Sequence, residues 1–487
     1  MAKTLNPTYL EHIRQQHPDG ERLDAFVRCC GTPLRTSIRV NQNAITEQQF
    51  TELSQSLEWQ LSPIPWSAEG YWVEFPSDKA LGNHIAHLAG CFYIQEASSM
   101  LPVQALCYQH QPHRVLDIAA APGSKTTQLM TQSHDDIWMV ANDMSANRLK
   151  MLNANLIRFG ISDVGLMNKD GRQITTQTEP LFDSILLDAP CGGEGTIRKD
   201  PKALDNWSHE SLQRIASVQK QLIEEAWRLL QPGGRLIYST CTLSREENQD
   251  VVAHLKQRVG DELTVVPLDE LFPSASKAAD HGVLHLWPEL FDSEGFFVAC
   301  LQKAKSEFTA LSTEPNVESL QIKFPKKPER KQVELIEAYF QQQFGIDINE
   351  LDYHLVSKSE TGKINYWLIP KTMSYLIEHL PMQRLGIRLC TLIESRRGYT
   401  VRTNHEFVRC FGDLADRQVL ALDDESCVLY FQGKNVQGLE AEALNQIQAG
   451  EIILTYLGNA IGLAKLINKT VLKNQLPRAL VHDKAWC

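Results

Sequence analysis

The stretch Val115-Leu-Asp-Ile-Ala-Ala-Ala-Pro-Gly-Ser-Lys-Thr126 predicts a buried β-strand that runs into a loop of small residues and then into a helix. Small residues let a ligand approach the backbone, and the N-terminus of a helix offers N–H groups that its own turns leave free. The loop is neither a Walker A loop nor the glycine fingerprint of dinucleotide enzymes, because it lacks both Gly-Lys-Ser/Thr and Gly-x-Gly-x-x-Gly. The stretch therefore indicates an α/β domain that binds a nucleoside-type ligand at the end of a strand.

Two cysteines follow two further hydrophobic runs of the same kind. Cys191 lies in Leu186-Leu-Asp-Ala-Pro-Cys-Gly-Gly-Glu-Gly195, and Cys241 lies in Leu236-Ile-Tyr-Ser-Thr-Cys-Thr242. Because the carboxyl ends of parallel strands meet at one edge of a sheet, we expect both thiols beside the ligand loop. Thiols in that position suit covalent chemistry on a bound substrate. The alternative for either cysteine, taken singly, is a small buried hydrophobic side chain.

Strands and helices alternate from about residue 112 to 302, which predicts a mainly parallel sheet covered by helices on both faces. Helices are expected to begin at Ser124 and Ser145, both of a type that favours N-cap positions. A long helix over about 211–230 is expected to end at Gln-Pro-Gly-Gly. The expected parallel strands are 114–120, 137–142, 163–168, 182–188 and 234–239, followed by an antiparallel pair near 283–287 and 295–302.

Acidic residues end four of these strands: Asp117, Asp143, Asp170 and Asp188. An acidic side chain after the second strand can accept both hydroxyls of a ribose. Four carboxylates at one edge would repel a phosphate-rich cofactor, whereas they suit S-adenosylmethionine, which carries a positive charge and no phosphate. This argument favours S-adenosylmethionine over NAD or ATP. The alternative that some of these aspartates only cap helices stays open, above all for Asp117.

The composition is that of a soluble globular protein of about two to four domains, with 487 residues, 43% hydrophobic and 22% charged. The eleven cysteines form no Cys-x-x-Cys pair, so we expect no disulfide framework, no metal site and a cytoplasmic location. No stretch is long and apolar enough for a membrane span, and no secretion signal is evident. A monomer is expected. The net charge of −11 argues against indiscriminate nucleic-acid binding.

The N-terminal region, residues 1–100, mixes short helical and strand-like pieces. Within it, Thr32-Pro-Leu-Arg-Thr-Ser-Ile-Arg-Val-Asn41 alternates polar and apolar residues, as an exposed strand does. Arg35 and Arg39 would then share one face. The alternative is an ordinary amphipathic edge strand with no role in binding.

The last third of the chain is expected to hold a polar, proline-punctuated linker over 304–331, a small α/β connecting region over 332–377 and a β-rich module over 378–487. Clusters of basic residues there favour a polyanionic partner on one side of the protein, although each cluster alone could be a solvated face. The expected strands of the module are 386–390, 427–431, 451–456 and 460–464. The basic residues are Lys323, Lys326, Lys327, Arg330, Lys331, Arg384, Arg388, Arg396, Arg397, Arg402, Lys465, Lys469, Lys473, Arg478 and Lys484.

Taken together, the motifs resemble those of the RNA cytosine-5 methyltransferases of the Sun family. The resemblance implies a Rossmann-like, S-adenosylmethionine-dependent methyltransferase domain over 101–303, with an N-terminal α/β extension over 1–100 that recognises RNA. The motifs that carry it are 93–100, 120–126, Asp143, Asp170, 188–191, 239–242 and 295–299.

Segments 384–388, 461–465 and 472–478 resemble the bacterial members of this family that act on small-subunit ribosomal RNA. Their C-terminal module is similar to a PUA-type RNA-binding barrel, which would be residues 378–487 here. The resemblance implies methylation of carbon 5 of one cytosine in the decoding region of 16S ribosomal RNA, in the small subunit or an assembly intermediate. A transfer RNA methyltransferase is the alternative within the family.

The resemblance also implies roles for individual residues. Cys241 would attack carbon 6 of cytosine, Asp188 would protonate ring nitrogen 3, and Cys191 would assist loss of the carbon-5 proton and product release. Lys125 is a candidate for electrostatic help to the Cys241 thiolate. The target base must leave its stack to reach the pocket. The implied cofactor-binding residues are Ala119, Ala120, Ala121, Pro122, Gly123, Ser124, Lys125, Asp143, Asp170 and Asp188.

Two positions depart from the family pattern. Gly192 follows Pro-Cys where the family usually has Ser, and Trp287-Pro288-Glu289 stands where the family often shows Pro-His. Three rival functions are disfavoured. An exocyclic-amine methyltransferase needs an Asn/Asp-Pro-Pro-aromatic turn, an NAD enzyme needs the glycine fingerprint, and a catalytically silent RNA-binding assembly factor has no need of two intact thiols.

Overall fold

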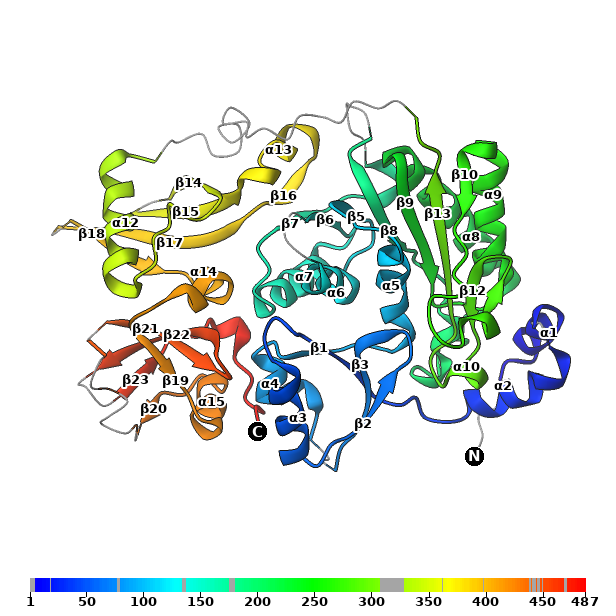
Figure 1. Cartoon of the computed structure of the whole chain (residues 1–487), viewed down its shortest axis with the longest axis horizontal. Helices are drawn as coiled ribbons and strands as arrows, with labels where there is room; N and C mark the ends of the chain where they lie inside the picture. The colour runs from blue at the N-terminus through cyan, green and yellow to red at the C-terminus, as the bar shows by residue number, and fades with distance from the viewer. Residues whose placement is uncertain are drawn as a thin grey trace.

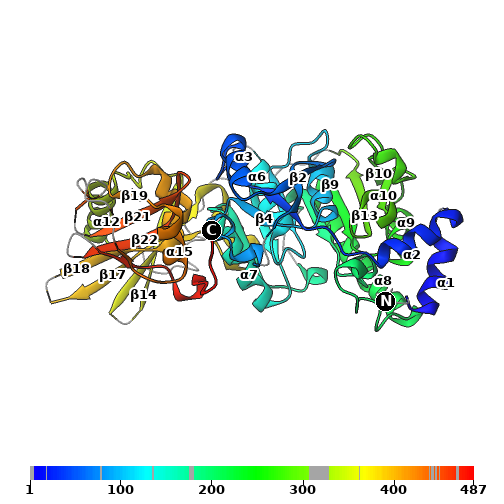
Figure 2. The same ribbon diagram turned by 90° about the horizontal axis from the view of Figure 1, so that it is seen from below.

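The computed structural model describes residues 5–487 apart from 18, 77–78, 134–136, 175–179, 307–327, 361, 397, 438, 440–443, 445–446, 449 and 468–470. Figure 1 shows a central β-sheet, an N-terminal region below it and two C-terminal regions to its left. Seen from below, the C-terminal regions form one end of the molecule and the first two helices the other (Figure 2). Most of the expected linker lies outside the described residues, as do Lys323, Lys326, Lys327, Arg397 and Lys469.

The central sheet has ten strands, five of them parallel and in the spatial order β9-β8-β5-β6-β7. The chain therefore winds outward from β5 in one direction and then from β8 in the other, as in doubly wound folds. The α/β fold predicted from the sequence is confirmed. The parallel strands are β5 (Arg114–Asp117), β6 (Trp138–Asn142), β7 (Val164–Met167), β8 (Phe182–Asp188) and β9 (Leu230–Thr240).

Antiparallel strands complete the sheet on both sides. β13 (Phe296–Lys303) pairs antiparallel with β9 and with β12 (Val283–Leu286), so the expected antiparallel pair is confirmed. β11 (Ala279–Asp280) lies beyond β12, and β10 (Leu263–Val265) pairs antiparallel with the end of β13. The opposite edge is covered by β16 (Met382–Arg384), which comes from the C-terminal part of the chain and pairs with β7. No sequence motif predicted this last pairing.

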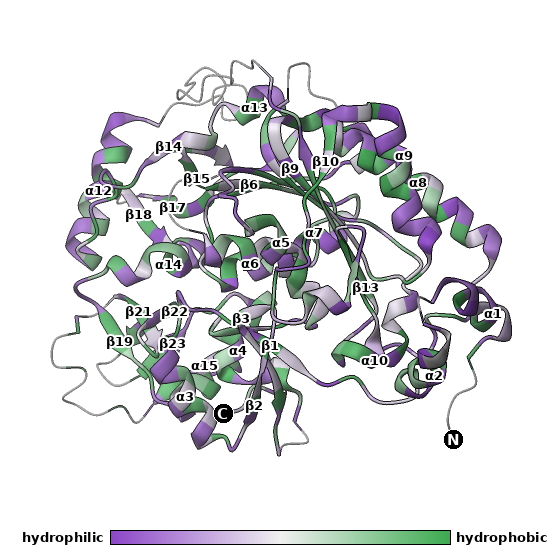
Figure 3. Cartoon of the chain, turned by 45° about the vertical axis from the view of Figure 1, so that its right-hand side comes forward, coloured by the Kyte–Doolittle hydropathy of each residue, from purple (hydrophilic) through white to green (hydrophobic). Residues whose placement is uncertain are grey.

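Helices pack on both faces because alternate strand residues point to opposite sides. Leu116 and Val140 join the cluster beneath α8 and α9, whereas Val115 and Met139 join the cluster beneath α5, α6 and α7. Figure 3 shows hydrophobic residues along the central strands and hydrophilic residues along parts of α8 and α9. These helices are α5 (Leu101–Cys107), α6 (Ser124–Gln132), α7 (Ala146–Arg158), α8 (His209–Leu229) and α9 (Gln249–Val259).

The N-caps of α6 and α7 differ from each other. Ser145 caps α7 as predicted, and its hydroxyl accepts from the Arg148 N–H. The cap of α6 is Gly123 rather than Ser124, because the loop turns there with φ at +105° and a Cβ would lie 2.5 Å from Leu152. Only glycine tolerates that combination of left-handed backbone and close packing.

The N-terminal region forms its own antiparallel sheet in the order β2-β3-β1-β4, with β1 in an interior position. The prediction of an exposed strand over 32–41 is therefore wrong, because all four residues of β1 are buried. Arg39 is 1% exposed and donates to Gln95, Thr127 and Thr131 at 2.9–3.0 Å. The elements are α1 (Pro7–Gln16), α2 (Leu23–Cys30), β1 (Ser37–Val40), α3 (Glu47–Ser56), β2 (Gln60–Ile64), β3 (Ser67–Glu74), α4 (Ile85–Leu88) and β4 (Phe92–Ile94).

The C-terminal part holds two sheets. The first, β14-β15-β17-β18, is antiparallel and spans the expected boundary at 377/378. Helix α12 (Arg330–Phe344) contributes Phe340 and Phe344 to the hydrophobic cluster that this sheet helps to form. Its strands are β14 (Tyr353–Glu360), β15 (Lys363–Pro370), β17 (Ile387–Ser395) and β18 (Gly398–Thr403), and α13 (Leu376–His379) lies between β15 and β17 in sequence.

The second sheet has the order β19-β21-β22-β23-β20. The strand predicted over 427–431 is wrong: these residues belong to helix α15, which Asp423 caps by accepting from the Ser426 N–H. A five-residue apolar run fits a buried helix turn as well as a strand, so its periodicity could not distinguish them. The elements are α14 (His405–Phe411), β19 (Val419–Ala421), α15 (Asp424–Phe431), β20 (Val436–Gln437), β21 (Glu451–Tyr456), β22 (Asn459–Ile467) and β23 (Val471–Asn474).

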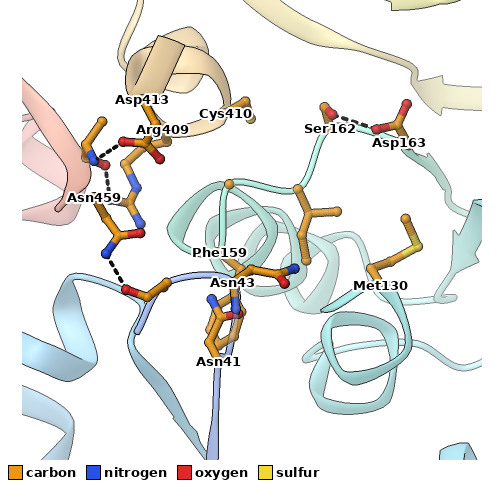
Figure 4. Close-up of a pocket in the computed structure, with 14 residues that line it drawn as sticks. Asn41, Asn43, Met130, Phe159, Ser162, Asp163, Arg409, Cys410, Asp413 and Asn459 are labelled. Atoms are coloured by element: carbon orange, nitrogen blue, oxygen red, sulfur yellow. Dashed lines mark hydrogen bonds between the residues drawn. The ribbon is translucent and has the colours of Figure 1, made fainter. Parts of the chain in front are cut away.

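Arg409 joins three regions of the chain. This buried side chain on α14 donates to the carbonyl oxygens of Ala89, Arg158 and Ala460, which belong to the N-terminal region, the central domain and the last sheet. Figure 4 shows Arg409 beside Asn459 and Asp413 at a small polar cavity of about 270 Å³ at this junction. These contacts fix the C-terminal sheets relative to the central domain. In the described ranges no helix has the length and apolar character that a membrane crossing requires.

Candidate active site

A cavity of about 820 Å³ opens at the carboxyl edge of the central sheet, where the winding direction changes between β5 and β8. Open α/β sheets bind their ligands at this point. The structure brings nearly all the predicted residues together around it, whereas Ala120 and Gly123 do not line it. The predicted residues that line the cavity are Ala119, Ala121, Pro122, Ser124, Lys125, Asp143, Asp170, Asp188, Cys191 and Cys241.

The two thiols lie next to each other in the lining of this cavity. The Sγ atoms of Cys191 and Cys241 lie 3.1 Å apart. The hydrogen bond to Cys241 and burial raise the pKa of Cys191 well above its usual value. Either sulfur can donate this hydrogen bond, and the raised pKa of Cys191 favours Cys191 as the donor and Cys241 as the acceptor. A sulfur that accepts a hydrogen bond is favoured as a thiolate, and the thiolate is the nucleophilic form of cysteine.

A charged pair lies beside the thiols. Lys125 Nζ donates to Asp188 Oδ2 at 2.6 Å and to Ser99 Oγ at 3.0 Å. Burial lowers the pKa of Lys125, but Asp188, and more weakly Cys241, outweigh it and raise the value above its usual range. The ammonium is therefore charged and favours negative charge on the neighbouring sulfur. Ser239 Oγ donates to the other oxygen of Asp188 at 2.7 Å, so both carboxylate oxygens already accept hydrogen bonds.

Two buried glutamates hold the loops that carry the thiols. Glu247 accepts from the Gly192 N–H at 2.9 Å and from Gln219 at 2.7 Å, and burial raises its pKa to about 7. Glu194 accepts from Trp207 Nε1 at 2.6 Å and from the Ser244 N–H at 3.1 Å. These hydrogen bonds fix the turn after β8, which carries Cys191, and the turn after β9, which carries Cys241. Sequence reasoning missed both glutamates, because neither belongs to a motif whose spacing indicates a partner.

The N-terminal helices contact the same loops. His12 on α1 shares a hydrogen bond of 3.1 Å with Ser244 Oγ, three residues after Cys241. Tyr9 and Phe26 belong to one hydrophobic cluster with Leu243 and Trp287. The first two helices therefore stabilise the loop that follows Cys241.

The opposite end of the cavity carries the predicted cofactor carboxylates. Asp143 is 2% exposed and accepts from the Ser145 N–H at 2.8 Å through Oδ1. Its Oδ2 has no hydrogen-bond donor within the described part of the chain, although Arg148 Nη1 lies 3.3 Å away as an ion-pair partner. A buried carboxylate oxygen without a donor fits the two hydroxyl groups of a ribose.

Two other aspartates are less available to a ligand. Asp170 accepts from the backbone and the side chain of Arg172, and these bonds lower its pKa. It lines the cavity but also caps a short 3₁₀ helix. Asp117 does not line the cavity: it lies under the loop, accepts from Thr126 at 2.8 Å, and burial raises its pKa to about 7. The prediction of four carboxylates around the ligand is therefore wrong for Asp117, which binds the Thr126 hydroxyl beneath the loop and does not cap a helix.

The two departures from the family pattern have physical explanations. A Cβ on Gly192 would lie 2.8 Å from Glu247 Oε1, so a serine there requires this glutamate to move. Trp287 is 3% exposed and packs on the rings of His17 and His285 at 4.2 and 4.7 Å. It fills the core between α2 and β12 and does not line the cavity.

Other lining residues were not predicted individually, among them Glu96, Lys199, Glu294 and Phe296. Glu96 and Phe296 lie within the 93–100 and 295–299 motifs, so the resemblance contained a signal for them. Glu294 immediately precedes the second of these motifs. Lys199 follows the turn that carries Cys191 and belongs to none of the motifs that carry the resemblance.

Comparisons with known proteins identify the family. The family described as 16S rRNA methyltransferase RsmB/F matches residues 103–302, the N-terminal domain of 16S rRNA methyltransferase RsmF matches 5–97, and the methyltransferase RsmF PUA domain matches 417–482. The chain is 41% identical over 483 residues to ribosomal RNA small subunit methyltransferase F of Shewanella oneidensis, covering 99% of this chain and 98% of that protein. The chain belongs to the ribosomal RNA small subunit methyltransferase F family. The Psychromonas ingrahamii relative of the same name is also 41% identical, over 489 residues and with the same coverage.

Solved structures agree with this assignment. A methyltransferase homologue from Pyrococcus horikoshii is 29% identical with a TM-score of 0.51, covering 61% of this chain and 100% of that one. NSun6 from Pyrococcus horikoshii, solved with SFG, has a TM-score of 0.54 at 22% identity over 62% of this chain and 99% of that one, a likeness of fold. The Rossmann-like methyltransferase fold and the C-terminal PUA domain predicted from the sequence are confirmed, and membership of the methyltransferase family carries the S-adenosylmethionine cofactor.

Proposed function

We propose that the chain methylates carbon 5 of one cytosine in the decoding region of 16S ribosomal RNA through a covalent bond between Cys241 and the base. The observation that carries this proposal is the pair of thiols 3.1 Å apart beside the cofactor cavity. A methyltransferase acting on an exocyclic amine or a hydroxyl has no use for a thiol, whereas carbon 5 of an aromatic pyrimidine needs a nucleophile on carbon 6. Cys241, the hydrogen-bond acceptor of the pair, is that nucleophile.

Residues at the cofactor end bind and orient the methyl donor. Asp143 accepts the ribose hydroxyls, Asp170 adds negative charge, and the small residues 119–124 admit the ligand to the backbone. S-adenosylmethionine supplies an electrophilic methyl group beside carbon 5.

Residues at the thiol end act on the cytosine. Lys125 favours the thiolate of Cys241, and Asp188 accepts hydrogen bonds from the Watson–Crick edge of the base. The family resemblance implies that Asp188 protonates ring nitrogen 3. With Lys125 and Ser239 donating to its two oxygens, Asp188 serves better as an acceptor for the exocyclic amine. Cys191 assists loss of the carbon-5 proton and release of the product.

Basic residues support an RNA partner for the C-terminal module. Lys465 and Lys473 lie directly opposite each other on β22 and β23, and both are exposed. Like charges in that position destabilise a sheet, so a polyanion that neutralises them is favoured. Arg384 is less available, because it pairs with Glu406. We place this reaction in the cytoplasm, on the small subunit or an assembly intermediate, with the enzyme as a monomer.

We assign an RNA-recognition extension to residues 1–100 and the methyltransferase domain to 101–303, followed by the linker 304–331. The continuous sheet β14-β15-β17-β18 supports extending the connecting region from 332–377 to Thr403. The PUA-like module then begins near α14, consistent with the family match over 417–482.

Bisulfite sequencing of ribosomal and transfer RNA from cells that lack the gene tests the substrate. The proposal expects one cytosine of 16S ribosomal RNA to lose its methyl group and to regain it when the purified chain and S-adenosylmethionine are added. Loss of cytosine methylation in a transfer RNA alone would show that the substrate is that transfer RNA, with the same chemistry. Unchanged methylation everywhere would favour a non-catalytic assembly factor.

A further inference from the structure

Glu294 is a buried carboxyl group at the thiol end of the cavity. It has no role in the reaction proposed above. It is 5% exposed, and it lines the cavity together with Cys191, Cys241 and Asp188. Its Oε1 is buried and has no hydrogen-bond partner among the described residues. A buried polar atom that faces a cavity without a partner indicates that a ligand supplies one.

The segment around Glu294 is fixed by the loop that carries Cys191. The Gly295 N–H donates to the Gly195 carbonyl at 3.0 Å, and a Cβ on Gly195 would lie 2.1 Å from the Gly295 carbonyl oxygen. The Glu294 N–H donates to Glu96 Oε1 at 3.1 Å. The Glu294 carboxyl is thus positioned by backbone contacts on both sides rather than by contacts of its own.

Glu96 and Glu294 form a pair of neighbouring carboxyls in which the proton belongs to Glu294. Glu96 accepts from the Ser98 hydroxyl, from the Ser99 N–H at 3.2 Å and from the Glu294 N–H, so its two oxygens already have donors. Burial, and then the charge of Glu96, raise the pKa of Glu294 to about 8, against the opposing effect of Lys199, Lys125 and Arg198. Near neutral pH the carboxyl is therefore a hydrogen-bond donor.

Glu294 and Asp188 thus offer opposite hydrogen-bonding characters to one base. Asp188 already accepts hydrogen bonds from Lys125 and Ser239 through its two oxygens, so it is placed to act as an acceptor. Cytosine has a donor at its exocyclic amine and an acceptor at ring nitrogen 3. The Asp188 carboxylate can accept from the exocyclic amine, and the Glu294 carboxylic acid can donate to ring nitrogen 3.

We propose that Glu294 is a further catalytic residue, the acid that protonates ring nitrogen 3 of the flipped cytosine while Cys241 adds to carbon 6. The proposal rests on the function proposed above. The sulfur lone pair forms the bond to carbon 6, the π electrons of the ring move toward nitrogen 3, and this nitrogen takes the proton, leaving Glu294 as a carboxylate. When the sulfur–carbon bond breaks after methylation, the proton returns from nitrogen 3 to Glu294.

The same arrangement selects cytosine over uracil. Uracil carries a proton on nitrogen 3 and an oxygen in place of the amine. The Glu294 hydroxyl would then face a donor, and the Asp188 carboxylate would face an acceptor. Both contacts are unfavourable, and buried polar groups left unpaired give strong discrimination between substrates.

The test is single-turnover methyl transfer from labelled S-adenosylmethionine to saturating RNA between about pH 6 and pH 9.5. For the wild type, the rate should fall above about pH 8, as Glu294 loses its proton. Glu294→Gln should be roughly 100-fold slower and should lack this fall, because general acid catalysis contributes about 10²–10⁴-fold. Asp163→Asn is the matched control, a buried carboxyl of raised pKa at the distant junction, and should keep the wild-type rate and profile.

A second test changes the RNA instead of the protein, so its result does not depend on whether a variant protein folds. With 3-deazacytosine at the target, nitrogen 3 is replaced by a C–H group, so wild-type transfer should be slow and the fall above pH 8 should vanish. A fall that persists on this substrate, or Glu294→Gln at the wild-type rate and profile, overturns the role of Glu294 and leaves the proposed function intact. A wild type that transfers no methyl group to cytosine overturns both.

Discussion

The two ends of the cavity are built differently. At the cofactor end, the carboxyl groups of Asp143 and Asp170 each accept from an N–H group two residues later in the sequence, and each pairs with a nearby arginine. At the thiol end, Cys191 and Glu294 have raised pKa values and keep their protons. Under the proposed function, the first end holds the cofactor, and the second end moves protons and forms bonds.

The supports of the two ends differ in the same way. The cofactor end depends on one loop and the start of two helices. The thiol end depends on contacts between residues far apart in the chain, such as His12 with Ser244 and Glu96 with Glu294. Binding can therefore be encoded locally, whereas the reacting groups need the N-terminal region, the central sheet and its last strand together. Substitutions at one end should therefore change cofactor binding, and substitutions at the other end should change methyl transfer.

The largest effect is expected for Cys241→Ala. Without the sulfur that adds to carbon 6, methyl transfer should fall about 10⁴-fold or more, as for other covalent nucleophiles. The dissociation constant of S-adenosylmethionine should stay within about twofold, because the cofactor end is untouched. Transfer of labelled methyl groups and calorimetry measure the two quantities. A variant that still turns over would move the nucleophile elsewhere.

Cys191→Ala should separate bond formation from bond breaking. If Cys191 assists release, this variant forms the RNA adduct and keeps it, so a protein–RNA band survives denaturing electrophoresis while turnover falls roughly 100-fold. Cys300→Ala, a buried cysteine outside the cavity, is the control and should give no such band. Normal turnover of Cys191→Ala without a stable adduct would reverse the division of roles between the two thiols.

Asp143→Asn should affect only the cofactor end. Hydrogen bonds to a charged acceptor contribute about 1.5–3 kcal/mol, so the dissociation constant of S-adenosylmethionine should rise roughly 10- to 100-fold. The methyl-transfer rate at saturating cofactor should change little. Asp170→Asn should raise the constant less than about fivefold, because Arg172 already occupies much of that carboxylate. Equal effects of the two substitutions would contradict the roles given to them.

Glu247→Gln tests the support behind Cys191 through pH-dependent stability. The pKa of Glu247 is raised to about 7 in the folded protein, above its value in the unfolded chain. Stability from this group is therefore complete below about pH 4.5 and is lost as pH rises to about 7. Relative to Glu247→Gln, the wild type should lose about 2–3 kcal/mol of unfolding free energy across that interval. Urea denaturation measures it.

Glu262→Gln, at an exposed carboxyl, is the control for this comparison and should follow the wild type at every pH. A difference between wild type and Glu247→Gln that does not change with pH would remove Glu247 from the list of buried titrating groups.

The sequence predicted the parts of the molecule that local patterns specify. The five parallel strands, the loop after β5 and the positions of both thiols follow from short apolar runs with distinctive residues at their ends. The position of Asp143 at the cavity follows from the same logic.

Other features depend on contacts that no local pattern encodes. Arg39 occupies a strand that alternates like an exposed one, and only its partners on other elements show that it is buried. The helix over 427–431 and the pairing of β16 with β7 depend on what packs against them. Glu194, Glu247 and Glu294 are ordinary acidic residues until the fold removes them from water.

The most direct test of the account uses RNA with 5-fluorocytosine at the target position. Fluorine cannot leave carbon 5 as a proton does, so the sulfur–carbon bond should persist after methyl transfer. We predict a denaturation-resistant complex that forms only with S-adenosylmethionine present, and peptide mass spectrometry should locate the nucleotide on Cys241. No complex, or a nucleotide attached to Cys191, would contradict the account.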